Sequence, residues 1–272
     1  MATVSQVLHL VGMDWATKPG KRALVALDVQ TDFATCRVVS VLDRISDAAA
    51  VAACSNSDLA IVAVDTPFGW PRQFAQFAST WRASTGTQAP PKSDEFRFRL
   101  TDRVVRDEVP KSPLSVSADR LAMGARAWAA LIAREAFGDR IDVLGVVRGK
   151  APTLIEVYPG ASAIAFGEPT TASPKKPPSY KPSETARRQL VEHVVSLFGI
   201  DAAGYLDVLV GKGARSDATD AFLAVVTAAI YLAERSGATL AQSGWRVRSP
   251  HSAEEKELAV SEGWIFFPLR PP

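Results

Sequence analysis

Short apolar runs separated by turn residues predict that the first third of the chain is mainly strands. The runs lie at Val7–Asp14, 22–29 and 34–42, and segments containing Gly, Pro or Asp separate them. An alanine-rich stretch at 43–53 predicts a helix, and Leu59–Asp65 returns as a fourth strand. Such aliphatic and β-branched runs are typical of buried strands. The order β-β-β-α-β favours a mixed sheet in which the first and fourth strands are neighbours.

Beyond residue 65 the strand pattern changes to helices and loops. Pro67, Gly69 and Pro71 interrupt any strand ladder, because proline lacks an N–H donor and glycine weakens a strand. Residues 72–82 predict a short aromatic helix, and 117–136 begin with a serine cap followed by apolar residues at helical spacing. The other predicted elements are a loop at 84–92, a charge-dense segment at 93–120, a strand at Thr153–Val157, a proline-rich loop at 170–182, helices at 183–198 and Asp217–Arg235, and a closing hairpin of 245–248 with 262–268.

The order of these elements predicts one domain with a large insertion. We expect residues 1–272 to form a single α/β domain, and the sequence contains no internal repeat. Residues 66–150, between the fourth and fifth strands, are expected to form an inserted, mainly helical subdomain. Its position in the chain would allow it to fold over the ends of the strands as a lid.

The composition narrows the class of protein. Apolar residues are 47% and charged residues 22% of the 272 residues, as in ordinary soluble proteins, and the net charge of +2 favours no class of partner. Two cysteines without CxxC spacing predict buried thiols, and three scattered histidines argue against a zinc cluster. The longest apolar segment, 221–233, is too short to span a bilayer, and the first residues lack the basic start of a signal peptide. We therefore expect a cytoplasmic protein without a membrane partner.

Acidic residues stand at positions where a carboxylate needs a partner. Asp14 and Asp65 end two apolar runs, where a carboxylate is costly to bury unless it is paired or binds a cation. Asp217 and Asp220 are three residues apart and share one helix face, and Glu156 lies within the fifth strand. Oxygen ligands suit Mg²⁺ or Mn²⁺, and two such ions stabilise the attacking and leaving oxygens of a phosphodiester displacement. This pattern indicates a metal site for phosphoryl chemistry.

Each of these acids also has a structural interpretation. Asp14 and Asp65 are common residue types in turns that follow strands. Asp217 is a possible helix cap, with Asp220 favoured near the same helix start by the helix dipole. Glu156 alternates with apolar neighbours and would face solvent on a half-buried strand. The residues alone leave both interpretations open.

Several segments together resemble a known family. The most specific are Ile155-Glu156-Val157-Tyr158-Pro159 and Glu262-Gly263-Trp264-Ile265, and the others are residues 12–16, 64–71, 101–103, 180–181 and 217–221. With these segments the chain resembles domain-of-unknown-function family 429, whose members are predicted ribonuclease H-like nucleases. The resemblance implies a ribonuclease H-like fold: a mixed five-stranded sheet (β-β-β-α-β-α-β-α) flanked by helices, with a large insertion after the fourth strand.

The resemblance also implies roles for the acids. Asp14, Asp65 and Asp220 are the implied ligands of Mg²⁺ or Mn²⁺, and Asp217 and Glu156 are further candidates for the catalytic set. Well-studied ribonucleases H carry one more acid on the helix after the third strand. This chain has only weak candidates there, and Glu156 is the candidate substitute.

Basic residues near the insertion are the candidate substrate-binding groups. Arg97, Arg99, Arg103 and Arg106 are interleaved with Phe and Val, a pattern suited to phosphate binding and base stacking. The alternative is a solvated basic face on a half-buried segment. Lys181 matches the family segment at 180–181 and is a further candidate for phosphate.

The leading prediction is a metal-dependent phosphodiester hydrolase, a nuclease acting on RNA or DNA by two-metal catalysis. One alternative is an ATP-binding phosphotransferase of the actin or sugar-kinase type, which would need a glycine-rich turn after the first strand. Residues 15–18 after Asp14 contain no glycine, which disfavours that alternative. The other is a catalytically idle nucleic-acid-binding protein with the same fold.

Overall fold

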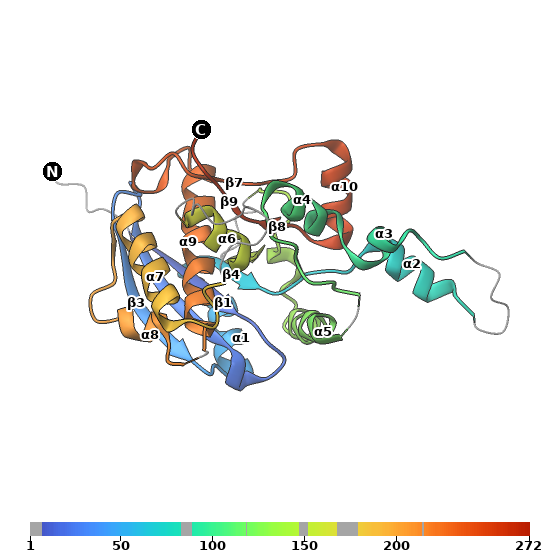
Figure 1. Ribbon diagram of the computed structural model, residues 1–272, viewed down its shortest axis with the longest axis horizontal. Helices are drawn as coiled ribbons and strands as arrows, with labels where there is room; N and C mark the ends of the chain where they lie inside the picture. Colours follow the sequence, from blue (N-terminus) through green and yellow to red (C-terminus); the bar gives the residue numbers. More distant parts are fainter. Residues whose placement is uncertain (1–6, 83–88, 118, 147–151, 168–178, 214) are drawn as a thin grey trace.

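A mixed seven-stranded sheet forms the centre of the computed structural model, which describes residues 7–82, 89–117, 119–146, 152–167, 179–213 and 215–272 (Figure 1). The strands are β1 (Val7–Asp14), β2 (Ala23–Gln30), β3 (Cys36–Asp43), β4 (Leu59–Asp65), β5 (Thr153–Val157), β6 (Ile200–Asp201) and β8 (Ile265–Phe266). Their order is β6-β3-β2-β1-β4-β5-β8. The pairs β1–β2 and β2–β3 are antiparallel, and every other pair in this sheet is parallel.

The five predicted strands form the middle of the sheet, and the predicted neighbours β1 and β4 are confirmed. The sheet is wider than the predicted five strands, because β6 and β8 add two residues each at its edges. The helix predicted at 43–53 begins later, as α1 (Asp47–Ser55). Asp43 is still paired with β2, and the Ser46 side chain accepts a hydrogen bond from the N–H of Ala49 to cap the helix.

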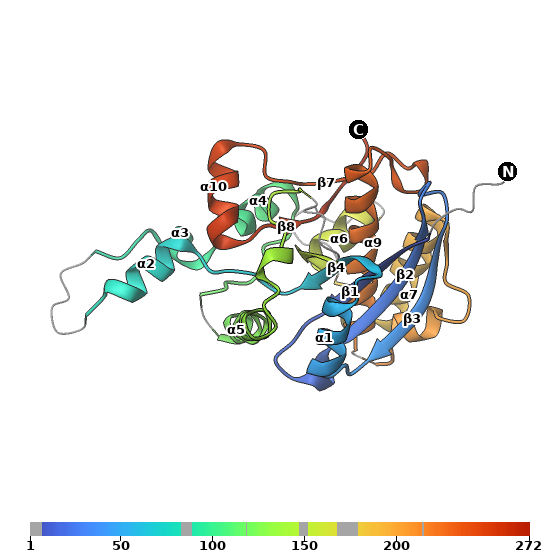
Figure 2. The same ribbon diagram turned by 180° about the vertical axis from the view of Figure 1, so that it is seen from behind.

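Helices cover both faces of the sheet (Figure 2). On one face lie α6 (Pro159–Phe166), α7 (Glu184–Phe198), α8 (Leu206–Val210) and α9 (Asp217–Arg235), which share the largest apolar cluster with the strands. On the other face, α1 and α5 (Asp119–Arg134) pack with Val11, Met13 and Val64 in a second cluster. Cys36 and Cys54 are both buried and unbridged, as predicted.

Helix α9 lies directly on β1 at Gly12. Side chains alternate along a strand, so Leu10 and Gly12 face α9 whereas Val11 and Met13 face the opposite cluster. A Cβ atom on Gly12 would lie 2.2 Å from the carbonyl oxygen of Ala221 and 2.4 Å from the backbone nitrogen of Val225. The glycine therefore permits contact between the two backbones. Every residue of α9 from 218 to 233 is buried.

The segment between β4 and β5 is helical, as predicted. It contains α2 (Arg72–Thr80), α3 (Ser93–Arg97), α4 (Leu100–Glu108), α5 and the short η2 (Gly138–Arg140). In both views α2 and α3 extend away from the sheet, whereas α4 packs against α10 (Ala253–Glu262). The division of the chain into one domain with a subdomain at 66–150 stays a prediction.

The predicted closing hairpin of 245–248 with 262–268 is confirmed in part. β7 (Arg246–Val247) pairs antiparallel with β9 (Pro268–Leu269), so Val247 meets Pro268 at the end of the second predicted arm, whereas β8 within that arm joins β5 in the main sheet. The ten-residue helix α10, with a capping box at Ser252 and Glu255, separates the two predicted arms. The buried Phe266 also requires the covered sheet edge that β5 offers. The predicted loop at 170–182 lies largely outside the described residues.

Within the described part of the chain, no helix combines the length and apolar character needed to cross a membrane.

Replacing Gly12 with Ala tests the backbone contact. Because a Cβ atom would overlap backbone atoms of α9, we expect Gly12→Ala to lower the free energy of unfolding by about 3 kcal/mol, measured by urea denaturation. Gly20→Ala is the matched control, since a Cβ at Gly20 meets no atom within 4 Å. Equal stability of the two variants would contradict the inferred contact.

Candidate functional site

Asp14 and Asp65 are direct neighbours at the carboxyl ends of two parallel strands. They are register partners in the β1–β4 pair. The alternation that directs Gly12 towards α9 directs Asp14 to the same face, and Ile61 and Ala63 set the same face for Asp65. The pairing therefore places both carboxylates beside the start of α9.

Asp220 comes from the first turn of α9 and is held in place by three donors. Its side chain is 3% exposed and accepts hydrogen bonds from the Tyr180 hydroxyl, the Lys181 ammonium at 2.8 Å and the Ser216 hydroxyl at 3.1 Å. Both of its oxygens are therefore engaged. Tyr180 and Lys181 lie just before α7, so the approach of two distant segments completes this part of the site.

Burial and neighbouring acids raise the proton affinity of Asp14 and Asp65. Burial, followed by repulsion from Asp220 and Asp65, raises the pKa of Asp14 well above its ordinary value. Burial raises the pKa of Asp65 to about 7; Lys181 opposes this rise, and Asp220 and Glu156 add to it. A cation at this position would relieve the repulsion.

Tyr158 also belongs to this cluster, although the sequence analysis assigned it no role. It follows β5 directly and caps the start of α6. Burial, and then the charge of Asp65, raise the pKa of Tyr158 to about 12. The sequence feature that could have pointed to Tyr158 as a site residue was its position two residues after Glu156, in the Glu-Val-Tyr-Pro segment.

The carboxylate oxygens of Asp14, Asp65 and Asp220 are suitable ligands for a hard divalent cation, although the three side chains do not surround one common position in this structure. Among the residues that the structure describes, no hydrogen-bond donor contacts the side chain of Asp14 or Asp65. Two neighbouring carboxylates with free oxygens are the ligands that Mg²⁺ and Mn²⁺ prefer. In the same described ranges, no three Asp, Glu, His or Cys side chains are grouped closely enough to hold an ion. Asp220 would have to release a donor to join them.

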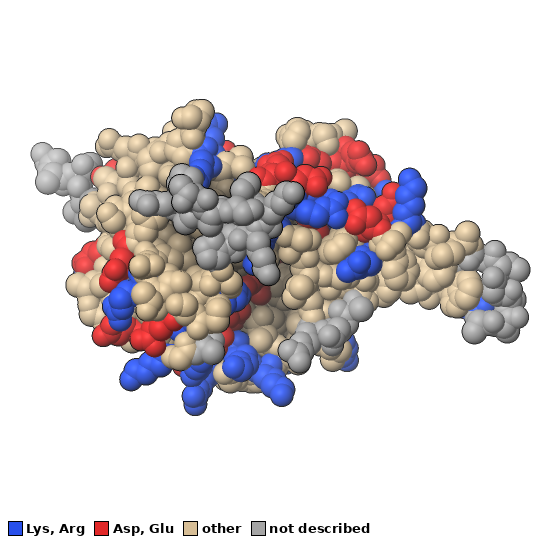
Figure 3. Space-filling view, viewed as in Figure 1, with Lys and Arg blue, Asp and Glu red and all other residues tan. Residues whose placement is uncertain are grey.

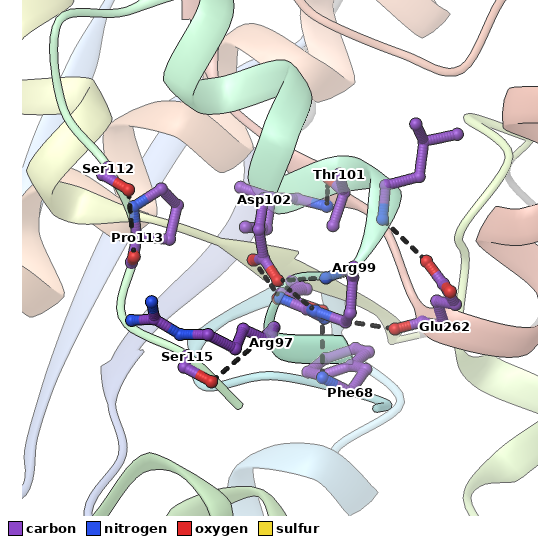
Figure 4. Close-up of polar contacts among 12 residues, drawn as sticks. Phe68, Arg97, Arg99, Thr101, Asp102, Ser112, Pro113, Ser115 and Glu262 are labelled. Carbon is purple, nitrogen blue, oxygen red and sulfur yellow. Dashed lines mark hydrogen bonds and ion pairs between the residues drawn. The ribbon is translucent and has the colours of Figure 1, made fainter. Parts of the chain in front are cut away.

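Glu156 and Arg99 form the centre of a buried ion-pair network (Figure 4). Their side chains are 2% and 1% exposed, and two bonds of 2.7 and 2.9 Å join them. Arg99 also donates to Asp102 at 2.9 and 3.1 Å and to the carbonyl oxygen of Glu262 at 3.2 Å. All five N–H donors of the guanidinium are therefore used within the protein.

This network argues against two predicted roles, those of Arg99 and Glu156. Arg99 has no donor left for a substrate, and Glu156 is engaged by Arg99 rather than available as a catalytic carboxylate or as a substitute ligand. Glu156 also accepts the backbone N–H of Phe68 at 2.9 Å. Burial raises the pKa of Glu156, and the charge of Arg99 opposes that rise. The pair anchors the turn after Asp65 to β5, so it supports the site without entering it.

A protein-family profile with the description "Protein of unknown function (DUF429)" matches residues 12–242. The chain belongs to this family. No curated protein and no solved structure matches the chain significantly. The matched part contains the three aspartates, Glu156 and Lys181, so the family's region of similarity includes the whole carboxylate cluster.

In this DUF429 member Asp217 lies at the edge of the cluster. Its side chain is 16% exposed, and its Oδ2 atom lies 3.6 Å from the Arg215 guanidinium. That oxygen is buried and has no hydrogen-bond partner among the described residues. Asp217 adds to the rise in the pKa of Asp14, so it acts on the cluster through charge.

The remaining predicted substrate-binding arginines lie on α3 and α4. Arg97 lies over the Phe98 ring at 5.1 Å from its centroid, and Arg106 pairs with Asp94 through two bonds of 3.0 Å. Arg103 is partly buried, and its Nε atom lacks a hydrogen-bond partner within the described ranges. None of the contacts described for Arg97 or Arg106 reaches the three aspartates.

The raised pKa of Asp65 predicts how stability depends on pH without metal. The native state binds more protons than the unfolded state between about pH 4 and pH 7, so this group lowers stability as the pH rises through that window. Asp65→Asn removes the effect. We subtract the free energy of unfolding of the natural protein from that of Asp65→Asn, both measured in EDTA. This difference should be about 2 kcal/mol larger at pH 8 than at pH 5. Asp58→Asn, at an exposed carboxylate, should show no such gain in thermal or urea unfolding.

The supporting network predicts a large loss of stability when one partner is removed. Arg99→Met leaves Glu156 and Asp102 buried without their cation, so we expect a loss of about 4 kcal/mol in urea unfolding. Arg106→Met breaks a half-exposed pair in the same region and should cost less than about 1 kcal/mol. Similar losses in both variants would show that the Arg99 network is not structural.

Proposed function

We propose that this protein is a Mg²⁺- or Mn²⁺-dependent phosphodiester hydrolase, a nuclease acting on RNA or DNA. The observation that carries the proposal is the pair Asp14 and Asp65, held side by side at the ends of neighbouring strands, with Asp220 presented by α9. Among the described residues the pair has no ion-pair partner of its own, unlike the acids around Arg99, and the charge of Lys181 offsets its repulsion only in part. Half-buried acids that the fold leaves without an ion-pair partner are candidates for a functional site.

The strand order supports the same proposal. The five central strands lie in the order β3-β2-β1-β4-β5. Within β3-β2-β1 each pair of neighbours is antiparallel, and β4 and β5 run parallel to β1. This arrangement is the one expected for a ribonuclease H-like sheet. In that fold the acids of the first and fourth strands bind the metal. This support comes from analogy of fold, and the chemistry rests on the site.

Asp14, Asp65 and Asp220 would hold the cation in this proposal. When bound, a divalent ion activates water and stabilises negative charge on a phosphate. The protein's own contribution is to fix the two neighbouring strand ends through the β1–β4 pairing and to place Asp220 opposite them. The ammonium of Lys181 and the hydroxyl of Tyr158, both near these acids, are groups able to bind phosphate oxygens.

Substrate contacts beyond the site are proposed for Arg97, Arg103 and Arg106. The Arg106–Asp94 pair is half exposed, so a phosphate can replace Asp94 as its partner at modest cost. On the face drawn in Figure 3, basic and acidic side chains are interspersed rather than gathered into one basic groove. We therefore propose that nucleic acid contacts these few arginines rather than an extended basic groove.

The turn after β1 argues against the ATP-binding alternative. Arg22 is buried, lies 3.6 Å from the centroid of the Trp15 ring and pairs with Asp47 at 2.5 Å. The aromatic ring and the guanidinium thus pack against each other in the place where a phosphate-binding turn would be needed. This packing leaves the proposed hydrolase as the function that the site supports best.

The direct test is cleavage of a panel of single- and double-stranded RNA and DNA in Mn²⁺ or Mg²⁺. We expect Asp14→Asn and Asp65→Asn each to lower the rate at least about 100-fold while circular dichroism shows an intact fold. Asp207→Asn is the matched control, because Asp207 is exposed and paired with Arg188 away from the cluster. It should leave the rate unchanged.

Thermal unfolding separates the alternatives. Stabilisation by Mn²⁺ that disappears in Asp65→Asn supports the metal site. Stabilisation by ATP without any response to Mn²⁺, or cleavage that survives both substitutions, would contradict the proposal.

A further inference from the structure

Lys181 places a cation of the protein's own against the carboxylate cluster. Its Nζ atom lies 2.8 Å from Oδ2 of Asp220, and its charge also opposes the burial-driven rise in the pKa of Asp14 and Asp65. The ammonium therefore interacts with all three of the acids that would bind a metal. One positive charge cannot balance three carboxylates, so repulsion among them remains and adds to the effect of burial on Asp14 and Asp65.

A divalent ion and the Lys181 ammonium compete for the same carboxylate oxygens. Both are small hard cations that need the same carboxylate oxygens, and Asp220 already uses both of its oxygens for Tyr180, Lys181 and Ser216. An ion held by all three aspartates would lie close to the ammonium, where like charges repel strongly in a partly buried site. Occupation by one cation therefore disfavours the other.

The side chain of Lys181 is free to leave, whereas its backbone is fixed. The side chain is 50% exposed, although Asp220 beneath it is 3% exposed. The Lys181 carbonyl oxygen accepts a bond of 2.5 Å from the buried Arg187, and the preceding Tyr180 is buried against Asp220. The ammonium can move into solvent by rotation of the side chain alone, without movement of the segment.

We propose that Lys181 and a divalent metal bind the cluster of Asp14, Asp65 and Asp220 in exchange for one another. This inference rests on the proposed metal-dependent function. In the metal-free protein the ammonium occupies the carboxylates and limits their repulsion. Metal binding releases it towards solvent, the side from which a substrate phosphate would approach.

The experiment is a calorimetric titration of the full-length protein with Mn²⁺ at fixed pH and ionic strength. Lys181→Met keeps the length of the side chain and removes the competing charge, so we expect the Kd for Mn²⁺ to fall about tenfold. Lys181→Arg keeps the charge and should bind Mn²⁺ about as the natural protein does. Arg188→Met removes a positive charge from another exposed ion pair, the one with Asp207, and should leave the Kd unchanged.

Thermal unfolding supplies a second readout. Without metal at pH 8, Lys181→Met should unfold at a lower temperature than the natural protein, because its carboxylates have lost their cation. Saturating Mn²⁺ should remove most of that difference, whereas a merely structural role for Lys181 would lower the temperature equally with and without metal. If Lys181→Met does not fold, Lys181→Gln provides the same comparison.

The outcomes distinguish the exchange from the metal site itself. Mn²⁺ binding that is unchanged or weaker in Lys181→Met, with binding still abolished by Asp65→Asn, overturns the exchange and leaves the metal site intact. Absence of Mn²⁺ binding in every variant, the natural protein included, overturns both the exchange and the proposed function.

Discussion

The contact between helix α9 and strand β1 at Gly12 is the constraint on which the rest of this structure depends. Any larger side chain there would hold the helix away from the sheet, because its Cβ would overlap backbone atoms of α9. With glycine, the helix lies on the middle of the sheet and buries every residue from 218 to 233. Apolar burial on this scale is the main source of stability in such a fold. The same contact brings Asp220 to the strand ends that carry Asp14 and Asp65.

The fold treats its buried acids in two ways. Glu156 and Asp102 are each paired directly with Arg99 by bonds of 2.7 to 3.1 Å, so both carboxylates have an ion-pair partner within the protein. Asp14 and Asp65 have no such partner among the described residues, and the charge of Lys181 is shared among the acids of the cluster. Acids with a direct ion-pair partner stabilise the loops around the site, whereas acids without one repel each other, and a bound cation would relieve that repulsion. This difference separates the supporting residues from the proposed functional ones.

Local patterns were sufficient to predict the strands that form the centre of the sheet and the three longest described helices, α5, α7 and α9. Residues 7–14 and 59–65 are short, β-branched apolar runs of the length and composition typical of buried strands. The two-residue strands β6 and β8 have no such pattern, because their pairing depends on which sheet edge happens to lie beside them. The partly confirmed hairpin shows the same limit: residues 265–266 of the second predicted arm pair with β5, and only the end of that arm, at Pro268, pairs with β7.

The sequence by itself determined that Asp14 and Asp65 would stand together, because each ends an apolar run and the element order makes those two strands neighbours. Only the tertiary structure decided which other charged residues belong with them. Glu156 and Arg99 have the residue types of a site and become a structural pair, since they meet in a buried place where each neutralises the other. Lys181 lies far from Asp14 and Asp65 in the chain and joins them through its ion pair with Asp220 in the first turn of α9. Partners of this kind are set by three-dimensional proximity and by the cost of burying unpaired charge, and neither can be read from spacing along the chain.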